Sequence, residues 1–157
     1  MSARIEIVPA QDPQQVALAR QLFREYADAI GVDLEYQGFS AELAALPSPY
    51  EPARGALLIA RIGSDTAGCV ALRRLDDRTG EIKRLYVRTS FRGLGVAECL
   101  IAAVVDAARR AGYAELKLDT LPSMTSAQAL YRKLGFATSP AYGDRHLPGT
   151  RFYSLAL

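Results

Sequence analysis

A stretch with two glycines and an arginine, FRGLGVA at residues 91–97, contains the first residues whose spacing suggests chemistry. Gly93 and Gly95 stand just before a helical apolar pattern. Because glycine costs about 0.5–1 kcal/mol relative to alanine in regular structure, they indicate a turn with an unusual backbone. Free N–H groups at a helix start bind phosphate, and Arg92 can add a charge-assisted contact. The spacing predicts a phosphate- or pyrophosphate-binding loop, with an ordinary tight turn as the alternative.

Two common phosphate-binding motifs do not fit this loop. A P-loop ends in Gly-Lys followed by Ser or Thr, whereas the helix here begins Gly-Val-Ala-Glu. A dinucleotide-binding fingerprint needs a third small residue where Glu98 stands, and it usually follows the first strand of its fold. Both fits are poor, and a nucleotide-binding module of another kind stays only as a minor alternative.

The composition indicates one globular domain over residues 1–157, because 50% of the residues are hydrophobic, enough for a continuous core. No stretch approaches the roughly 20 apolar residues of a membrane span, and the N-terminus lacks a signal peptide's apolar centre. We therefore expect a cytoplasmic protein without a membrane partner. A net charge of +2 is too small to favour nucleic acid. Cys69 and Cys99 are expected to be buried thiols, and the single histidine, without ligand spacing, predicts no metal.

Changes in the apolar period divide the chain into strands and helices that must position these residues. Asp12 precedes a proline and predicts a helix N-cap, and Gly31 ends that helix. Ser40 is expected to cap a short helix, and Thr125 with Gln128 to form a capping box. The predicted helices are 13–30, 41–46, 95–111 and 125–134, and the predicted strands are 4–9, two around a turn at 63–65, 80–88, 114–120 and 150–157. This order predicts an α/β protein with helices on a central sheet.

Residues 82–120 resemble the core of the GNAT superfamily, the acyl-CoA-dependent N-acyltransferases. Arg92, Gly95 and Ala97 match the family's pyrophosphate-loop motif, and AQALYRKLGF at 127–136 resembles its next helix. The resemblance covers residues 4–157 in element order. It implies a single-domain GNAT fold, a mixed sheet of about seven strands flanked by about four helices, with strands four and five splayed to bind acetyl-CoA.

The resemblance also implies the reaction and the cosubstrate contacts. An acetyl group would pass from acetyl-CoA to a primary amine by direct attack on the thioester, without a metal. Many relatives carry an asparagine where this chain has Met124, so a neighbouring serine or threonine is expected to supply that polar contact. Arg88 and Arg132 are candidates for the other CoA phosphates, or else solvated surface arginines. The residues expected to bind acetyl-CoA are Leu85, Tyr86, Val87, Arg92, Gly93, Leu94, Gly95, Val96, Ala97 and Ser126.

Two side chains are candidates for proton transfer. An alkyl amine with a pKa near 10.4 is neutral in only about one molecule per thousand at physiological pH, so a base is expected. The resemblance implies Glu81, the only acid on its strand, with a solvated carboxylate beside Lys83 as the alternative. Tyr131 stands where relatives often protonate the departing thiol, and a phenol of pKa about 10 suits that role. Its alternative is a core tyrosine.

The acceptor is predicted from charge. Between Glu25 and Ala53 there are six acids and no lysine or arginine. In GNAT relatives this region forms the acceptor wall, so Glu25, Glu35 and Tyr36 are expected to bind a small cationic amine. The alternatives are carboxylates that only solvate helix faces, acetylation of a protein N-terminus or lysine, and a catalytically silent CoA sensor. A monomer or a homodimer is expected.

Overall fold

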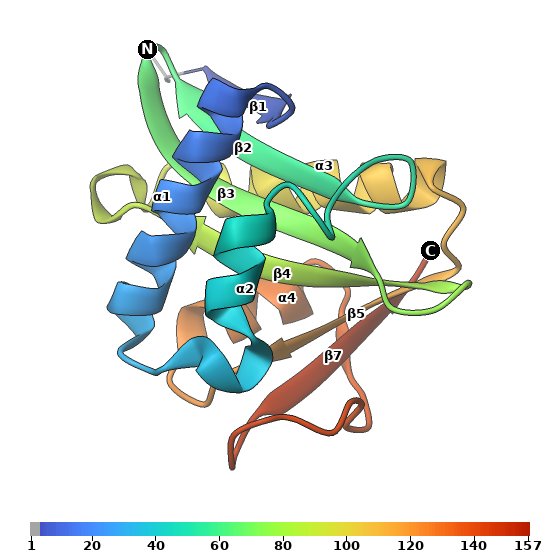
Figure 1. Ribbon diagram of the computed structural model, residues 1–157. Coiled ribbons are helices and arrows are strands. Elements are labelled where there is room, and N and C mark those ends of the chain that lie inside the picture. Colours follow the sequence, from blue (N-terminus) through green and yellow to red (C-terminus); the bar gives the residue numbers. More distant parts are fainter. Residues whose placement is uncertain (1–3) are drawn as a thin grey trace.

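The computed structural model describes residues 4–157, and its central feature is a seven-stranded sheet in the order β1-β2-β3-β4-β5-β7-β6. Helices α1 and α2 lie on one face of this sheet, and α3 and α4 lie on the other (Figure 1). The elements are β1 (Ile5–Pro9), α1 (Pro13–Ile30), η1 (Leu34–Gln37), α2 (Phe39–Ala45), β2 (Ala56–Ile62), β3 (Asp65–Arg74), β4 (Thr79–Val87), η2 (Thr89–Phe91), α3 (Val96–Arg110), β5 (Glu115–Thr120), α4 (Thr125–Lys133), β6 (Ala137–Thr138) and β7 (Arg151–Ala156).

The predicted ends of α1 agree with the structure, whereas the predicted caps of α2 and α4 do not. Asp12 accepts a hydrogen bond from the Gln15 N–H at 2.8 Å, and Gly31 ends α1 in the left-handed conformation, as predicted. The predicted cap at Ser40 is wrong, because α2 begins at Phe39, two residues before the predicted start, and its N-cap is Gly38. The predicted Thr125–Gln128 capping box is also wrong: no side chain caps α4, and the Gln128 amide instead donates to Leu121 O.

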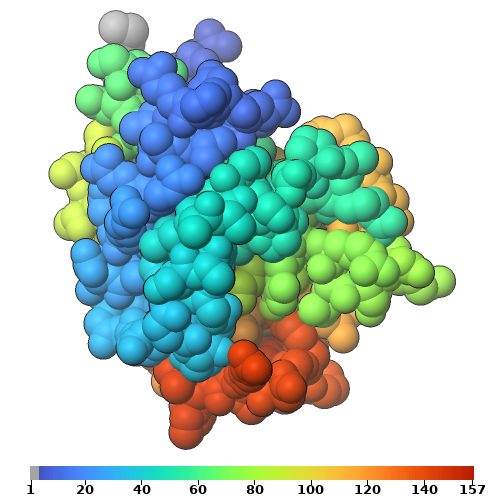
Figure 2. Space-filling model, viewed as in Figure 1, coloured from blue at the N-terminus to red at the C-terminus, as the bar shows by residue number. Residues whose placement is uncertain are grey.

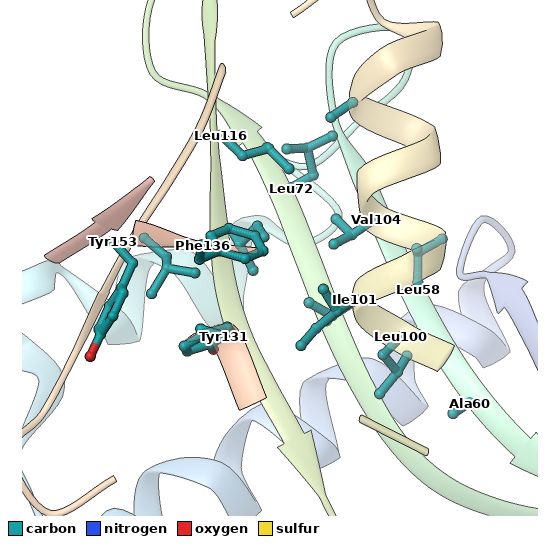
Figure 3. Packing of buried hydrophobic residues seen from close by; sticks show 14 of the residues in the cluster. Leu58, Ala60, Leu72, Leu100, Ile101, Val104, Leu116, Tyr131, Phe136 and Tyr153 are labelled. Atoms are coloured by element: carbon teal, nitrogen blue, oxygen red, sulfur yellow. The ribbon is translucent and has the colours of Figure 1, made fainter. Parts of the chain in front are cut away.

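The sheet separates two apolar clusters. On the α3 and α4 side, α3 residues such as Leu100, Ile101 and Val104 pack against Leu58 and Leu72 of the sheet (Figure 3). On the other side, Leu22 and Phe23 of α1 pack with Leu57, Ile59 and Cys69. Both faces are therefore covered, and the sheet is held in place by helices on each side.

Strands β4 and β5 are parallel but stay paired over a short distance only. Their register consists of Thr79 with Glu115, Gly80 with Leu116, and Glu81 with Lys117. Beyond Glu81 the two strands separate, and Figure 1 shows them diverging toward one side of the molecule. β5 continues its pairing with β7 instead. The expected splay between strands four and five is therefore present, and it leaves one edge of β4 without a neighbouring strand.

A bulge interrupts β4 just where the splay begins. Cys69 of β3 pairs with Tyr86 and Ala71 pairs with Lys83, so β4 has one extra residue across this interval. Arg84 has a φ of 62°, the only positive φ at a non-glycine residue within 4–157. The extra residue breaks the alternation of side chains, with the result that Lys83 and Arg84 both face the same pocket. Nothing in the sequence pattern indicated this bulge.

Candidate active site

The loop between β4 and α3 has the backbone that the glycines predicted. Gly93 and Gly95 have φ angles of 78° and 84°, in the left-handed region. Gly95 is the N-cap of α3 without a side-chain cap, and Cys99 N–H donates to Gly95 O at 3.1 Å. A Cβ atom added at either glycine would meet no heavy atom within 4 Å. The first N–H groups of α3 therefore face open space that an anion can enter.

Most of the predicted cosubstrate residues lie along the segment that runs from the unpaired edge of β4 through this loop to the start of α3. Leu85, Tyr86 and Val87 are half-buried at the end of β4, beyond the last pair with β5. Arg92 is exposed, and its Nε donates to Val87 O at 3.3 Å, which ties the loop to the strand end. Leu94, between the two glycines, is exposed by 54%. Val96 and Ala97 form the first turn of α3, where Ala97 is half-buried and the side chain of Val96, 1% exposed, packs in the core.

The two arginines considered for the other phosphates are already engaged. Arg88 donates to both carboxylate oxygens of Glu25, at 2.9 and 2.8 Å. Arg132 donates to the Tyr153 hydroxyl at 3.0 Å. At the start of α4, Met124 occupies the N-cap position, and the Thr120 hydroxyl donates to its sulfur at 3.3 Å. Ser126, the second residue of α4, is exposed and accessible to a ligand.

Tyr131 lies in the core at the inner side of α4. It is 5% exposed and packs against Phe136 and Tyr153, with ring centroids 5.6 and 6.1 Å away (Figure 3). Its hydroxyl has no hydrogen-bond partner among the described residues. Among those residues the only solvent-inaccessible side-chain nitrogen or oxygen without a partner is Arg54 Nε, so the Tyr131 hydroxyl retains some contact with solvent. Burial raises the pKa of Tyr131, and the charge of Asp119 raises it further, so the phenol keeps its proton.

A pocket of about 310 Å³ lies beside the splay, on the face of the sheet that carries α1 and α2. Figure 2 shows the molecule hollowed where the cyan α2 region, the green β3–β4 segment and the orange-red C-terminal segment meet. Tyr36 is the only one of the three predicted acceptor residues among its lining residues. The others are Gln37, Glu42, Pro49, Tyr50, Arg73, Leu75, Glu81, Lys83, Arg84, Asp119, Tyr142, Gly143, Asp144 and Arg145.

Glu81, the predicted base, is fully engaged in this pocket. It is 2% exposed, its Oε1 accepts from Arg73 Nε at 2.6 Å, and its Oε2 accepts from the Tyr142 hydroxyl at 2.7 Å. Both carboxylate oxygens thus accept hydrogen bonds from protein groups. The alternative predicted from the sequence, a solvated carboxylate beside Lys83, is therefore wrong. This geometry does not favour Glu81 as the group that takes a proton from the acceptor.

Lys83 and Asp119 are functional candidates that the sequence reasoning missed. Each stands two residues beyond the last β4–β5 pair, Glu81 with Lys117, so they flank the start of the splay. Within residues 4–157 neither makes an ion pair or a side-chain hydrogen bond, and both line the pocket. Burial lowers the pKa of Lys83 and raises the pKa of Asp119. The parallel pairing that aligns them is not visible in the sequence.

Two acids of the predicted acidic wall are paired with arginines from β4 and the residue that follows it. Glu25 pairs with Arg88 at 2.8 Å and Glu42 pairs with Arg84 at 2.7 Å. The Glu35 carboxylate accepts hydrogen bonds from the backbone N–H and hydroxyl of Ser40. A charge count along residues 25–53 could not detect these arginines, because Arg84 and Arg88 lie 42 and 63 positions after the acids they pair with.

Residues 18–136, well over half of the chain, match the acetyltransferase (GNAT) family. The chain belongs to this family. An uncharacterized N-acetyltransferase of Schizosaccharomyces pombe is 33% identical over 157 residues, which cover 99% of this chain and 96% of that protein. The family resemblance inferred from the loop and α4 motifs is therefore confirmed, and the GNAT protein described here is an N-acetyltransferase.

Solved structures confirm the GNAT fold. An acetyltransferase from Streptococcus agalactiae superposes with a TM-score of 0.79 at 21% identity, over 98% of both chains. A GNAT acetyltransferase from Elizabethkingia anophelis, solved with acetyl-CoA bound, gives a TM-score of 0.67 at 22% identity, also over 98% of both chains. The mixed seven-stranded sheet with four helices, predicted from the sequence, is thus the GNAT architecture.

Membrane-spanning helices and metal-ligand clusters are both absent from residues 4–157 of this GNAT chain. No helix in that range combines the length and apolar character needed to cross a membrane. No three histidine, cysteine, aspartate or glutamate side chains in the same range are grouped so that they could hold a metal ion.

Proposed function

We propose that the protein transfers the acetyl group of acetyl-CoA to a primary amine of a small molecule held in the pocket beside the splay. The observation that carries this proposal is the arrangement around the β4–β5 opening. The start of α3, which has no side-chain cap and follows two glycines with left-handed backbone, lies on the β4 side of the opening. The pocket lined by charged residues lies where the two strands begin to diverge. A cosubstrate and an acceptor could thus approach the same gap from opposite faces of the sheet.

The residues present fit acetyl-CoA. The open space at Gly93 and Gly95 suits the pyrophosphate, because backbone N–H groups can approach its oxygens without a Cβ between them. The free edge of β4 at Leu85, Tyr86 and Val87 suits the pantetheine arm as an added strand. Acetyl-CoA bound to the Elizabethkingia GNAT protein supports the same cosubstrate here.

The chain's own groups would then divide the work. Acetyl-CoA supplies an activated thioester, and a backbone N–H of β4 would donate to its carbonyl oxygen as negative charge develops there. Tyr131 would give its proton to the departing sulfur, because its raised pKa keeps the hydroxyl protonated and its hydroxyl keeps an opening to solvent. Ser126 and the exposed part of the loop would contact the rest of the cosubstrate.

The acceptor is a small molecule in this proposal, because a volume of about 310 Å³ is at the low end of the range for ligand pockets. A preference for cationic amines, predicted from the acidic segment, loses its main support. Glu25 and Glu42 are each paired with an arginine, and Glu35 does not line the pocket. The carboxylates of α1 and α2 therefore add little free negative charge where an acceptor would bind.

The cosubstrate site is tested with two glycines at opposite ends of α3. Gly95 and Gly112 have φ angles of 84° and 88°, and a Cβ at either position meets nothing within 4 Å. Changing either to alanine therefore costs similar backbone strain. We expect Gly95→Ala to weaken acetyl-CoA binding by about tenfold or more, since about 1.4 kcal/mol corresponds to tenfold. Gly112→Ala should bind as the wild type does, as measured by calorimetry.

Equal affinities of the two variants would contradict the loop assignment. Catalysis is tested separately by thiol release from acetyl-CoA in the presence of a panel of amines, amino acids and peptides. Release that depends on an amine supports the transferase. Tight acetyl-CoA binding without release against any amine would instead favour a CoA sensor of the same fold.

A further inference from the structure

The pocket floor carries one cation and one anion that have no protein partner. Arg73 is paired with Glu81 at 2.6 Å, and Arg84 with Glu42 at 2.7 Å. Asp144 and Arg145 also line the pocket, but they are exposed at its rim. Within the described residues, this leaves the half-buried side chains of Lys83 and Asp119 as the unpaired charges on the sheet itself.

Leaving two opposite charges unpaired in a half-buried site is unfavourable unless something else satisfies them. Lys83 and Asp119 stand at equivalent positions on the diverging strands, yet they do not form an ion pair with each other. The neighbouring carboxylates of Glu81 and Glu42 are each held by an arginine, so neither forms an ion pair with Lys83. The floor is therefore complementary to a ligand with one positive and one negative group.

The β4 bulge explains how this arrangement arises. Arg84, at a φ of 62°, turns toward α2 and donates to both oxygens of Glu42, at 3.0 and 2.7 Å, and to Gln37. Because Arg84 and Glu42 are bonded to each other, neither the guanidinium nor this α2 carboxylate is available to a ligand. Lys83, on the same face, stays free, because the bulge places two consecutive residues over one pocket.

We propose that the acceptor is an amine that also carries a carboxylate, such as a free amino acid, with its carboxylate on Lys83 and its amine on Asp119. This inference rests on the proposed acetyl transfer and names the acceptor class for it. A carboxylate on a lysine ammonium is a charge-assisted hydrogen bond, stronger than a neutral one. The amine then lies at the base of the splay, where the acetyl group would enter.

Asp119 has a second role in this arrangement, because the amine arrives as an ammonium. The ammonium gives one proton to the Asp119 carboxylate, which returns it to solvent through the pocket. The neutral nitrogen forms a bond to the acetyl carbon as the carbon–sulfur bond breaks, and the sulfur leaves with that electron pair and takes a proton from Tyr131. The second amine proton restores Tyr131 through solvent, so one proton is released per turnover. A carboxyl with a raised pKa is a better base for this step.

The acceptor class is tested by comparing each of the twenty amino acids with its amide and with simple alkylamines and putrescine, using thiol release. We expect kcat/KM for the best amino acid to exceed that for its own amide by about 10- to 100-fold, the range for hydrogen bonds between charged groups. This preference should fall to near unity in Lys83→Met and be partly restored in Lys83→Arg.

Lys117→Met is the matched control. Lys117 lies on β5 and faces the same side of the sheet, where it pairs with Glu115 at 3.7 Å, but it does not line the pocket. It should keep the wild-type preference. The affinity for acetyl-CoA and the thermal midpoint of unfolding are measured for each variant, so that a loss of activity caused by misfolding can be identified. The comparison of amino acid with amide in the wild-type protein does not depend on any variant.

The role of Asp119 is tested by a pH profile. The wild-type kcat/KM should fall as the pH drops through the raised pKa of Asp119, and this acidic limb should disappear in Asp119→Asn along with most of the rate. The charged and titratable groups that act on Asp119 come from β3, β4, α1, η1, α4 and the loop before β7: Arg73, Glu81, Lys83, Arg84, Tyr26, Tyr36, Tyr131 and Tyr142.

The outcomes separate the two proposals. Amine-dependent thiol release in which amides, alkylamines or putrescine match the amino acids would overturn the acceptor class and leave acetyl transfer standing. An amino-acid preference that survives in Lys83→Met would also overturn it. No acetyl-CoA binding and no thiol release with any amine would remove the proposed function itself.

Discussion

Tyr131 is the residue whose surroundings best match a single chemical role. Burial in contact with Phe136 and Tyr153 raises its pKa above the usual phenol value, so the hydroxyl is protonated at neutral pH. It would therefore act only as a proton donor and would add no basic limb to a pH–rate profile. The same burial fixes the ring, so the donor lies in one position when a thiolate forms.

Removal of this hydroxyl is the first prediction. Tyr131→Phe keeps the ring packing, so we expect turnover to fall by roughly 10- to 10,000-fold while the Kd for acetyl-CoA changes little. Tyr153→Phe is the control, because Tyr153 is the neighbouring core tyrosine and its hydroxyl only accepts from Arg132. Steady-state kinetics with calorimetric binding measures both, and equal turnover in the two variants would return Tyr131 to a purely structural role.

At the scale of the element, β4 depends on a close approach by β3. Gly68 lies opposite Val87, and a Cβ at Gly68 would overlap the carbonyl oxygen of Tyr86 and lie 3.2 Å from Val87 Cα. Because these are backbone atoms, the end of β4 must move if a side chain is added. Glycine at this position is thus needed for the strand edge on which the pantetheine is proposed to bind.

Gly68→Ala is therefore expected to raise the Kd for acetyl-CoA by about tenfold and to lower the free energy of unfolding by about 1–3 kcal/mol. Gly80→Ala is a control at the paired end of β4, where the added Cβ would meet only side-chain atoms of Leu72 and Tyr113. It should lower stability without changing the Kd. Calorimetry and urea unfolding measure the two effects, and an unchanged Kd in Gly68→Ala would argue against the proposed strand pairing.

At this scale the sequence predicts the features that depend on neighbouring residues in the chain. The bounds of α1 follow from Asp12 and Gly31, and the turn at Gly93 and Gly95 follows from two glycines before an apolar helix. The bulge at Arg84 could not be predicted, because its left-handed backbone is favoured only by contacts with Glu42 and Gln37, 42 and 47 positions away.

The candidate site shows the same division. The left-handed glycines of the loop and the helix that carries Tyr131 follow from local sequence, and their roles in the site stay predictions. The sequence predicts Glu81 as the base because it is the only acid on its strand. Its hydrogen-bond partners, Arg73 and Tyr142, come from β3 and from the loop before β7, and the local sequence does not indicate them. Asp119 and Lys83 are brought together by a three-pair parallel register, and a sequence without its pairing partners contains no signal for that.

For the whole molecule, the ion pair of Glu42 and Arg84 joins the α2 layer to the sheet. The Arg84 side chain is 2% exposed, and the Tyr50 hydroxyl donates to Glu42 at 2.8 Å. Burial alone would raise the pKa of Glu42, but hydrogen bonds and charge from Arg84 outweigh it and leave that pKa lowered. A lowered pKa means that the pair stabilises the fold above the unfolded value, about 4.3, and that this contribution is lost as the pH falls through the folded pKa.

Glu42→Gln should lower the free energy of unfolding at pH 7 by about 3 kcal/mol, because a buried guanidinium loses its counter-charge. The difference from the wild type should shrink as the pH falls below the folded pKa of Glu42. Asp77→Asn is the control, since its pair with Arg74 is exposed, and no measurable change is expected. Urea midpoints at pH 7 and in acid measure both, and a destabilisation as large in acid as at pH 7 would contradict this account.

The splay between β4 and β5 also has a mechanical consequence. The sheet consists of two plates, β1 to β4 and β5 with β7 and β6, joined along three residue pairs. A short seam of this kind concentrates any relative movement of the plates, so amide hydrogens along the diverging part of β4 should exchange with solvent faster than those of β3. A pantetheine arm bound in the opening would connect the two plates and restrict their relative movement. The flexibility of the sheet would therefore fall when acetyl-CoA binds and return when CoA leaves, once in every catalytic cycle.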